Sequence, residues 1–325
     1  MSFLKKLFGQ RAETGFRIYY TGDIHGSELC FRKLLKAPDF YKVDAVIVGG
    51  DITGKAMLPV VEQPNGTFVA RIQGNERTIQ AEELEKLEDS IRFNGFYPYR
   101  CTPAEHARLD ADDDFRKSIF TGVMVAQIER WCAMAAEQRR DGLPMFIMPG
   151  NDDEFAIDQA IGGDGVVNPE GRLVELGPLQ MVSCCWANPT PWHSPREENE
   201  TALAERLERM ASALTPGRPT ILNLHCPPFD SALDMAPKLT DDLRPVMSGG
   251  QPVITPVGSK AVRALIERLQ PVLTLHGHIH ESRGIAKIGR TTCVNPGSQY
   301  SEGRLDGAVI ELAGNEIISC QLVSG

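Results

Sequence analysis

The chain has 325 residues, of which 42% are hydrophobic and 24% charged, and its formal net charge is −9 at pH 7. This size and balance predict a globular protein with a sizeable core, organised over residues 1–325 as a single domain that can include an insertion. The acidic excess argues against a bulk electrostatic attraction to nucleic acid or to an anionic membrane.

Five short apolar runs end abruptly in glycine and polar residues. Each run has the length and the β-branched or aromatic content of a strand. In chain order they are FRIYY (16–20), VDAVIV (43–48), LPMFIM (143–148), PTILNL (219–224) and PVLTL (271–275). Amphipathic helical patterns follow the first run, at 27–37, and precede the fifth, at 259–270. Strands that alternate with helices predict an α/β core, in which ligands gather beyond the carboxyl ends of the strands.

Residues 57–140 interrupt this alternation of strands and helices. The stretch 57–74 predicts a hairpin with its turn at Asn65–Gly66, and the stretch 76–93 predicts a helix. The TPAE segment at 102–105 is a capping box that opens a further helix, with a break near the acidic DADDD.

This region is longer than an ordinary crossover, so we predict that residues 57–140 form an insertion. Two roles are open for it. It forms a lid in which Tyr97, Tyr99 or Arg100 narrows the entrance to a site, or it forms a helical buttress on the far side of the domain.

The remaining elements follow the third run. A hairpin is expected around Gly177–Pro178. The SPRE segment at 194–197 reads as a second capping box and predicts a helix through about residue 214. Strands are expected at 290–298, 306–312 and 316–323.

Polar residues that can bind metal follow each of the five runs. They are Asp23 and His25, then Asp51, then Asn151 and Asp152, then His225, then His278 and His280. Two divalent ions roughly 3.5–4 Å apart need a bridging ligand, for which Asp51 is the candidate, and several nitrogen or oxygen ligands each. Imidazole with carboxylate suits Mn, Fe, Co, Ni or Zn better than Mg or Ca. Taken singly, each residue has an ordinary interpretation as a helix cap, a turn residue or a core histidine.

With all five blocks in this order, the chain resembles the calcineurin-like metallophosphoesterases. Their pattern is D-x-H, G-D, G-N-H-[DE], H and G-H-x-H, and the resemblance runs from about Phe16 to the final strands. It implies two facing mixed β-sheets flanked by helices, with two divalent metal ions at the strand ends. By position, the resemblance implies that the first ion is held by Asp23, His25 and His280, that Asp51 bridges, and that the second ion is held by Asn151, His225 and His278. His276 matches no ligand position and is expected to support or pack against the site.

One block departs from the family pattern, because Asp152 stands where the family has a histidine implicated in protonating the leaving group. An ordinary aspartate is ionised near neutrality and is a poor proton donor. Either a raised pKa makes Asp152 the acid, or protonation comes from water or matters less.

The resemblance implies a metal-dependent phosphoester hydrolase in which a hydroxide between the two ions attacks phosphorus. Asp51, Asn151 and Asp152 are the candidate catalytic residues. The missing histidine favours a phosphodiester substrate, with nucleotides among the candidates. The alternatives are a phosphomonoesterase or protein phosphatase, and a metal-binding regulatory protein without turnover.

Three residues are candidates for binding substrate. Lys55 and Arg283 lie near metal-site blocks and are candidates to bind phosphate oxygens, and Asn295 belongs to an NPGS segment that can contribute to the pocket. The alternatives are solvated charges and a structural turn. The segment 188–197 either places Trp192 or His193 near the substrate or packs before a helix.

The chain has eight cysteines without C-x-x-C spacing, which predicts buried free thiols in a reducing compartment. The start, MSFLKKLFGQR, contains no apolar stretch of signal-peptide length, and no run has the length of a membrane span. These observations predict a cytoplasmic protein.

Overall fold

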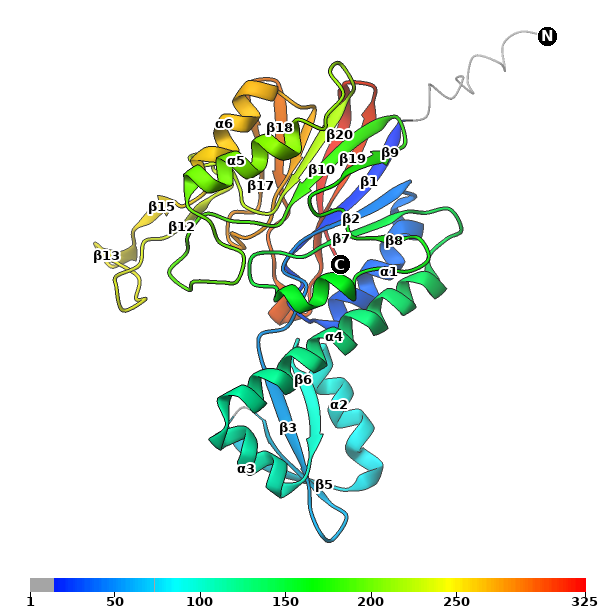
Figure 1. Ribbon diagram of the computed structural model, residues 1–325, viewed down its shortest axis with the longest axis vertical. Helices are drawn as coiled ribbons and strands as arrows, with labels where there is room; N and C mark the ends of the chain where they lie inside the picture. Colours follow the sequence, from blue (N-terminus) through cyan, green and yellow to red (C-terminus); the bar gives the residue numbers. More distant parts are fainter. Residues whose placement is uncertain (1–14, 73) are drawn as a thin grey trace, which may run out of the picture.

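The computed structural model describes residues 15–72 and 74–325. Two six-stranded mixed sheets form the main body, and helices flank them (Figure 1). This is the α/β sandwich with an inserted hairpin and helical region that the sequence predicts and that the resemblance to metallophosphoesterases implies. The first residues, on which part of the expectation of a cytoplasmic protein rests, lie outside the described residues.

The first sheet is mixed, with its parallel strands at one side. Its order is β20 (Glu316–Ser324), β19 (Asp306–Ala313), β1 (Phe16–Thr21), β2 (Ala45–Gly49), β7 (Met145–Met148) and β8 (Val166–Val167). The pairs from β1 to β8 are parallel, and β19 is antiparallel to both of its neighbours. Along β2, Ala45 and Ile47 pack against the second sheet, whereas Val46 and Val48 pack beneath α1 (Glu28–Tyr41) and α4 (Asp113–Gln138). Alternate residues of one strand therefore fill two cores.

The second sheet is also mixed, but its parallel strands lie in the middle. Its order is β17 (Gly284–Ile288), β18 (Thr291–Asn295), β16 (Leu273–Leu275), β11 (Thr220–Leu224), β10 (Leu179–Cys184) and β9 (Leu173–Leu176). The four strands from β18 to β10 are parallel, and the two edge pairs are antiparallel. Helices α5 (Glu200–Ala211) and α6 (Lys260–Leu269) cover its outer face, where Val262, Leu265 and Ile266 are buried as the amphipathic pattern predicts.

The insertion forms a lobe that projects from the main body (Figure 1). It contains β3 (Met57–Glu62), β4 (Phe68–Ile72), β5 (Asn75–Ile79), η2 (Ala81–Glu83), α2 (Leu84–Phe93), β6 (Tyr97–Cys101) and α3 (Pro103–Ala111). The strand order is β5-β4-β3-β6, and a small core including Val60, Phe68 and Ile91 holds α2 on the sheet. The predicted hairpin and the capping box at Thr102 are confirmed, and α4 leads from the lobe back to the main body.

The predicted helix over 76–93 is wrong in its first part. Residues 75–79 form β5, with Ile79 opposite Phe68 of β4. Pairing along an existing strand outweighs the local preference of this stretch, because β-structure depends on the neighbouring strand more than on intrinsic propensity. The helix itself begins at Leu84.

The second predicted capping box does not open a helix. Ser194 and Glu197 hydrogen bond to each other, but they close a loop rather than a helical turn. Helix α5 begins at Glu200, and the side chain of Asn199 caps it by accepting the N–H groups of Thr201 and Ala202. Asparagine is as favourable an N-cap as serine, so the helix can begin here without the serine.

Shorter elements complete the described structure. They are β12 (Met235–Pro237), β13 (Met247–Ser248), β14 (Gln251–Pro252), β15 (Ile254–Pro256), η3 (Phe155–Gln159) and η4 (Tyr300–Glu302). The hairpin at Gly177–Pro178 joins β9 to β10 as predicted. The eight cysteines are free, and all except Cys320 are buried. Within the described ranges, no helix has both the length and the apolar character needed to cross a membrane.

Candidate metal centre

The candidate metal ligands follow the carboxyl ends of parallel strands from both sheets. Asp23 and His25 follow β1, Asp51 follows β2, Asn151 follows β7, His225 follows β11, and His278 and His280 follow β16. Backbone hydrogen bonds join these loops. The N–H of His25 donates to the carbonyl of Asp51 at 3.0 Å, and the N–H of Gly277 donates to the carbonyl of His225 at 3.0 Å. The structure thus brings all of these residues into one group.

The backbone at this group is strained. The angle φ is +52° at Asp23, +39° at His25, +50° at Asp51 and +67° at His278. Left-handed backbone costs a non-glycine residue on the order of 1–3 kcal/mol, and such residues concentrate at functional sites. Four of the candidate ligands have this left-handed backbone. The position of their side chains therefore comes at a cost in local stability.

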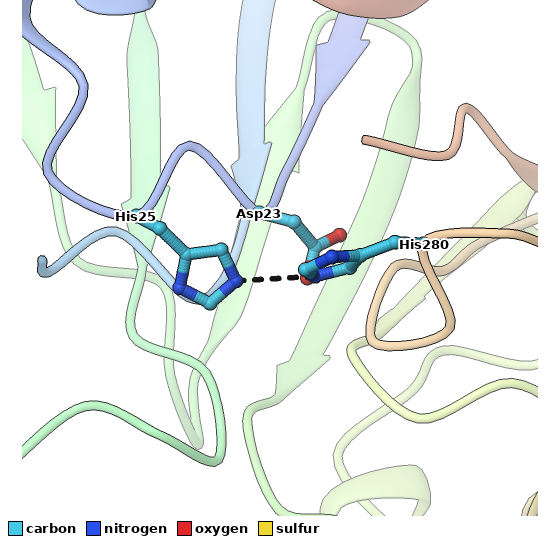
Figure 2. Close-up of side chains that lie close together, drawn as sticks. All are labelled: Asp23, His25 and His280. Carbon is cyan, nitrogen blue, oxygen red and sulfur yellow. Dashed lines mark hydrogen bonds and ion pairs between the residues drawn. The ribbon is translucent and has the colours of Figure 1, made fainter. Parts of the chain in front are cut away.

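One cluster contains Asp23, His25 and His280 (Figure 2). The Nε2 atoms of His25 and His280 lie 3.1 Å apart, and the Nε2 of His280 lies 3.4 Å from Oδ1 of Asp23. Among the described residues, the buried Nδ1 of His25 has no hydrogen-bond partner. Two imidazole nitrogens that face each other beside a carboxylate are a donor set suited to a single cation.

A second cluster is built around Asn151. Its Oδ1 lies 2.9 Å from Nε2 of His225 and 2.7 Å from Nδ1 of His278. The other ring nitrogen of His225, Nδ1, donates to the carbonyl of Gly49 at 2.8 Å. This bond fixes the ring and, in neutral imidazole, leaves the lone pair of Nε2 directed into the cluster.

Asp51 lies between the two clusters. Its Oδ1 is 3.4 Å from Nε2 of His225, and its Oδ2 is 3.7 Å from Nε2 of His25. Metal–ligand bonds of about 2.1 Å at right angles would separate two donor atoms by about 3.0 Å, close to the spacings in both clusters. The Asp and His side chains are therefore arranged so that they can bind a metal ion, and Asp51 is shared between two such groups.

Burial and charge set the protonation of these groups. Burial lowers the pKa of His25 and of His278 to about 4, which leaves both imidazoles neutral with a lone pair to offer. Burial alone raises the pKa of Asp51, but the neighbouring imidazoles, His225 above all, hold it well below its usual range. Burial lowers the pKa of His225, but the charge of Asp51 outweighs burial and raises it to about 10. The buried carboxylate of Asp51 thus stabilises positive charge on the groups next to it.

A buried carboxylate that the sequence reasoning missed supports the group. Asp153 accepts hydrogen bonds from the N–H groups of Gly150 (2.7 Å), Ile52 (3.0 Å) and Thr53 (2.8 Å), and from Thr53 Oγ1 at 2.6 Å. It therefore joins the loop that carries Asn151 to the loop that carries Asp51. The sequence feature that could have identified Asp153 is its position directly after Gly150, Asn151 and Asp152.

Two further contacts fix the orientation of ligands. Nδ2 of Asn151 donates to Oγ of Ser194 at 2.7 Å, which turns the amide oxygen towards the histidines. His276 is fully buried, and its Nδ1 lies 2.9 Å from the carbonyl oxygen of Leu224 at the end of β11. His276 thus supports the strand end that precedes His225.

Asp152 lies beside the candidate ligands, and its side chain is 29% exposed, about as much as that of His280 at 28%. Its Oδ2 lies 2.8 Å from Nζ of Lys55, and its N–H donates to Asp51 Oδ1 at 3.0 Å. Its carboxylate is close enough to His25 and Asp51 to share a cation with them. The ring of Tyr300, which the sequence reasoning also missed, lies 4.7 Å from the ring of His25.

The other two candidate substrate residues are engaged elsewhere. Nδ2 of Asn295 donates to the carbonyls of Leu233, Gly277 and Ile279, so this buried side chain positions the loop before His280. The guanidinium of Arg283 donates to the carbonyls of Pro296 and Val323 and lies 3.7 Å from Asp306. These contacts engage the amide of Asn295 and two nitrogens of the Arg283 guanidinium within the fold. A contribution of Asn295 to the pocket and phosphate binding by Arg283 stay predictions.

Two of the residues expected to form a lid, Tyr97 and Arg100, are held by contacts with other residues. Tyr97 is buried, and its hydroxyl accepts the N–H of Gly54 at 2.7 Å. Arg100 forms an ion pair with Glu88 inside the lobe. These contacts hold Tyr97 and Arg100 in place, and a lid role for Tyr99 stays a prediction. The turn between α2 and β6 is the part of the lobe that packs against the loop carrying His25.

Comparisons with known proteins bear on the fold. No protein-family model matches the chain. The uncharacterised protein MJ1162 of Methanocaldococcus jannaschii is 29% identical over 159 residues, which are 48% of this chain and 65% of that protein, slightly less than two thirds of its length.

Two solved structures are similar over nearly the whole chain. TT1561 of Thermus thermophilus superposes with a TM-score of 0.53 at 14% identity, covering 96% of this chain and 99% of its own. Another structure superposes with a TM-score of 0.57 at 16% identity, covering 95% and 98%. At these identities the similarity shows a shared fold, the sandwich of two mixed sheets described above.

Proposed function

We propose that the protein is a metal-dependent phosphoester hydrolase that favours phosphodiesters. The observation that carries this proposal is the position of Asp51, whose two oxygens face imidazole nitrogens of two different clusters. A carboxylate in this position is suited to bridge two divalent cations. The donor set of imidazole, amide and carboxylate favours Mn, Fe, Zn or Ni.

Each residue then has a defined task. Asp23, His25 and His280 would hold one cation. Asn151, His225 and His278 would hold the other, with Asp51 shared between the two. When bound, such a pair of cations acidifies a water to make the nucleophile and neutralises charge on the phosphoryl oxygens. The chain itself orients these ligands through the buried supports Asp153, Ser194 and His276.

Lys55 and Asp152 form the exposed edge of the site. The ammonium group of Lys55, paired with Asp152 beside the clusters, is suited to pair with a phosphate oxygen. Its partner Asp152 stands where a proton-donating histidine would assist a poor leaving group. Without an imidazole there, diesters with good leaving groups are the expected substrates.

A metal-by-substrate screen tests the proposal. Purified protein would be assayed with Mn, Fe, Ni, Zn and Mg against bis-p-nitrophenyl phosphate, p-nitrophenyl phosphate and cyclic nucleotides. His278→Ala should abolish turnover, whereas His106→Ala, the same change on α3 of the lobe, should not. Hydrolysis of monoesters alone would favour a phosphatase, and no turnover with any metal would favour a regulatory metal-binding protein.

A further inference from the structure

Two exposed aromatic side chains belong to segments that pack against the two clusters of the metal centre. Phe96 is 43% exposed and follows the α2–β6 turn of the lobe, and Trp192 is 65% exposed in the loop after β10. Large aromatic side chains bury apolar area well, so their display beside a site indicates a binding surface.

Close backbone packing places Phe96 beside the first cluster. The α2–β6 turn approaches so closely that a Cβ on Gly95 would lie 2.7 Å from the carbonyl oxygen of His25, and one on Gly54 would lie 2.3 Å from the carbonyl oxygen of Gly95. The hydroxyl of Ser27 also donates to the carbonyl of Phe93 at 3.3 Å. The residue after Gly95 is therefore held next to the loop that carries the ligand His25.

Hydrogen bonds place Trp192 beside the second cluster. The carboxylate of Glu197 accepts the N–H and hydroxyl of Thr190, at 2.9 and 2.6 Å, and the N–H and hydroxyl of Ser194, at 2.8 and 2.5 Å. Ser194 in turn contacts Asn151 at 2.7 Å. Two residues span at most about 7 Å, so Trp192 is held close to the ligand Asn151.

A third ring, that of Tyr300, lies against the first cluster. Tyr300 contacts the rings of both His25 and His280, at 4.7 and 6.0 Å between ring centroids. The first cluster is thus bordered by Tyr300 and Phe96, and the second by Trp192. A loop closed by four hydrogen bonds loses little further freedom when its tryptophan binds a ligand, which favours affinity.

We propose that the substrate is a phosphodiester with a planar ring on the ester group that stays bound to phosphorus, and that this ring stacks on Trp192 or on Phe96 beside the metal centre. The inference rests on the proposed function and narrows its substrate class. Stacking of one ring on an aromatic side chain corresponds to a gain of about 5- to 150-fold in affinity. Planar rings of any kind satisfy this requirement, so a simple aryl group and a nucleobase share the chemistry.

Kinetics with a constant leaving group test the proposal. The substrates are the p-nitrophenyl diesters of methyl phosphate, phenyl phosphate and thymidine 5′-phosphate. The second and third should exceed the first in kcat/KM at least about fivefold, and preference for the third over the second would indicate a nucleoside. Trp192→Ala and Phe96→Ala together should bring the kcat/KM values of the second and third substrates, each divided by that of the first, to about one. The control is Phe40→Ala, because Phe40 is 77% exposed at the far end of α1.

A binding measurement separates this inference from the proposed function. Calorimetry should show that phenylphosphonate binds the metal-loaded protein at least about fivefold more tightly than methylphosphonate, and the double variant should lose this difference. Equal binding of the two phosphonates would overturn the inference even if diesters are hydrolysed. A ring preference that depends on Trp192 and Phe96 would support it even if no diester is hydrolysed, an outcome that would count only against the proposed function.

Discussion

Replacement of the buried carboxylate Asp153 by asparagine tests how the two metal-binding loops are held together. One oxygen of Asp153 accepts two donors on Thr53, and the other accepts the N–H groups of Gly150 and Ile52. An asparagine keeps one acceptor oxygen, so two buried donors lose their partner whichever way the amide turns. Each stranded donor costs about 1–3 kcal/mol, and removal of the repulsion with Asp51 offsets part of this, so we expect a loss of about 2–4 kcal/mol.

The assay is urea unfolding of the metal-free protein, followed by metal titration of the folded variant. The free energy of unfolding should fall by the amount above, and metal affinity should fall because Asp51 and Asn151 are no longer held in register. The control Asp164→Asn changes a carboxylate that is 85% exposed in its ion pair with Arg139 and should cost less than about 1 kcal/mol. An Asp153→Asn protein with unchanged stability and unchanged metal affinity would refute the reasoning.

Three further changes have defined outcomes. Burial raises the pKa of Glu170 to about 7, so the folded state binds this proton more tightly and wild-type stability falls as pH rises from 4.5 through 7. Glu170→Gln should therefore leave the free energy of unfolding unchanged at pH 4.5 and raise it by about 3 kcal/mol at pH 8 in urea titrations. Gly277→Ala would place a Cβ 2.3 Å from Oδ2 of Asp23 and should weaken metal binding measured by calorimetry, whereas Gly162→Ala, with open space around it, should not. Asp152→His should raise kcat/KM for poor-leaving-group monoesters more than for bis-p-nitrophenyl phosphate, because imidazole can donate a proton.

Each of these three predictions has a result that would contradict it. A pH-independent difference between Glu170→Gln and wild type would show that Glu170 keeps an ordinary pKa. Full metal affinity in Gly277→Ala would show that a methyl group at residue 277 does not disturb the side chain of Asp23. Equal gains for both substrate types in Asp152→His would remove the proposed link between residue 152 and the leaving group.

The strand–turn positions of the ligands could be predicted because they are local features. An apolar run followed by glycine and a polar residue marks a strand end, and parallel strands bring such ends to one edge of a sheet. His25 and His280 are far apart in the chain, yet their ring nitrogens lie 3.1 Å apart. The order of the five motif blocks, through the resemblance that it carries, was enough to predict that these two side chains lie close together.

The rest depends on contacts that no local pattern encodes. Strand β5 exists because β4 offers it an edge, and the chain at 75–79 looked helical without that partner. The hydrogen bonds of Arg283 to the carbonyls of Pro296 and Val323 could not be predicted, because these residues are brought to it only by the folded chain. Tyr300 reaches His25 only through the folded chain.

The metal content of wild type and Asp51→Asn tests the central claim most directly. Asparagine keeps the shape of the side chain but removes the charge that bridges the two clusters. After loading with Mn or Zn and removal of free metal, elemental analysis should find two ions per wild-type chain and one or fewer per variant chain, with Asp164→Asn as the control that keeps two. Two ions retained by Asp51→Asn, or a wild-type chain that never binds more than one, would contradict a dinuclear centre bridged by Asp51.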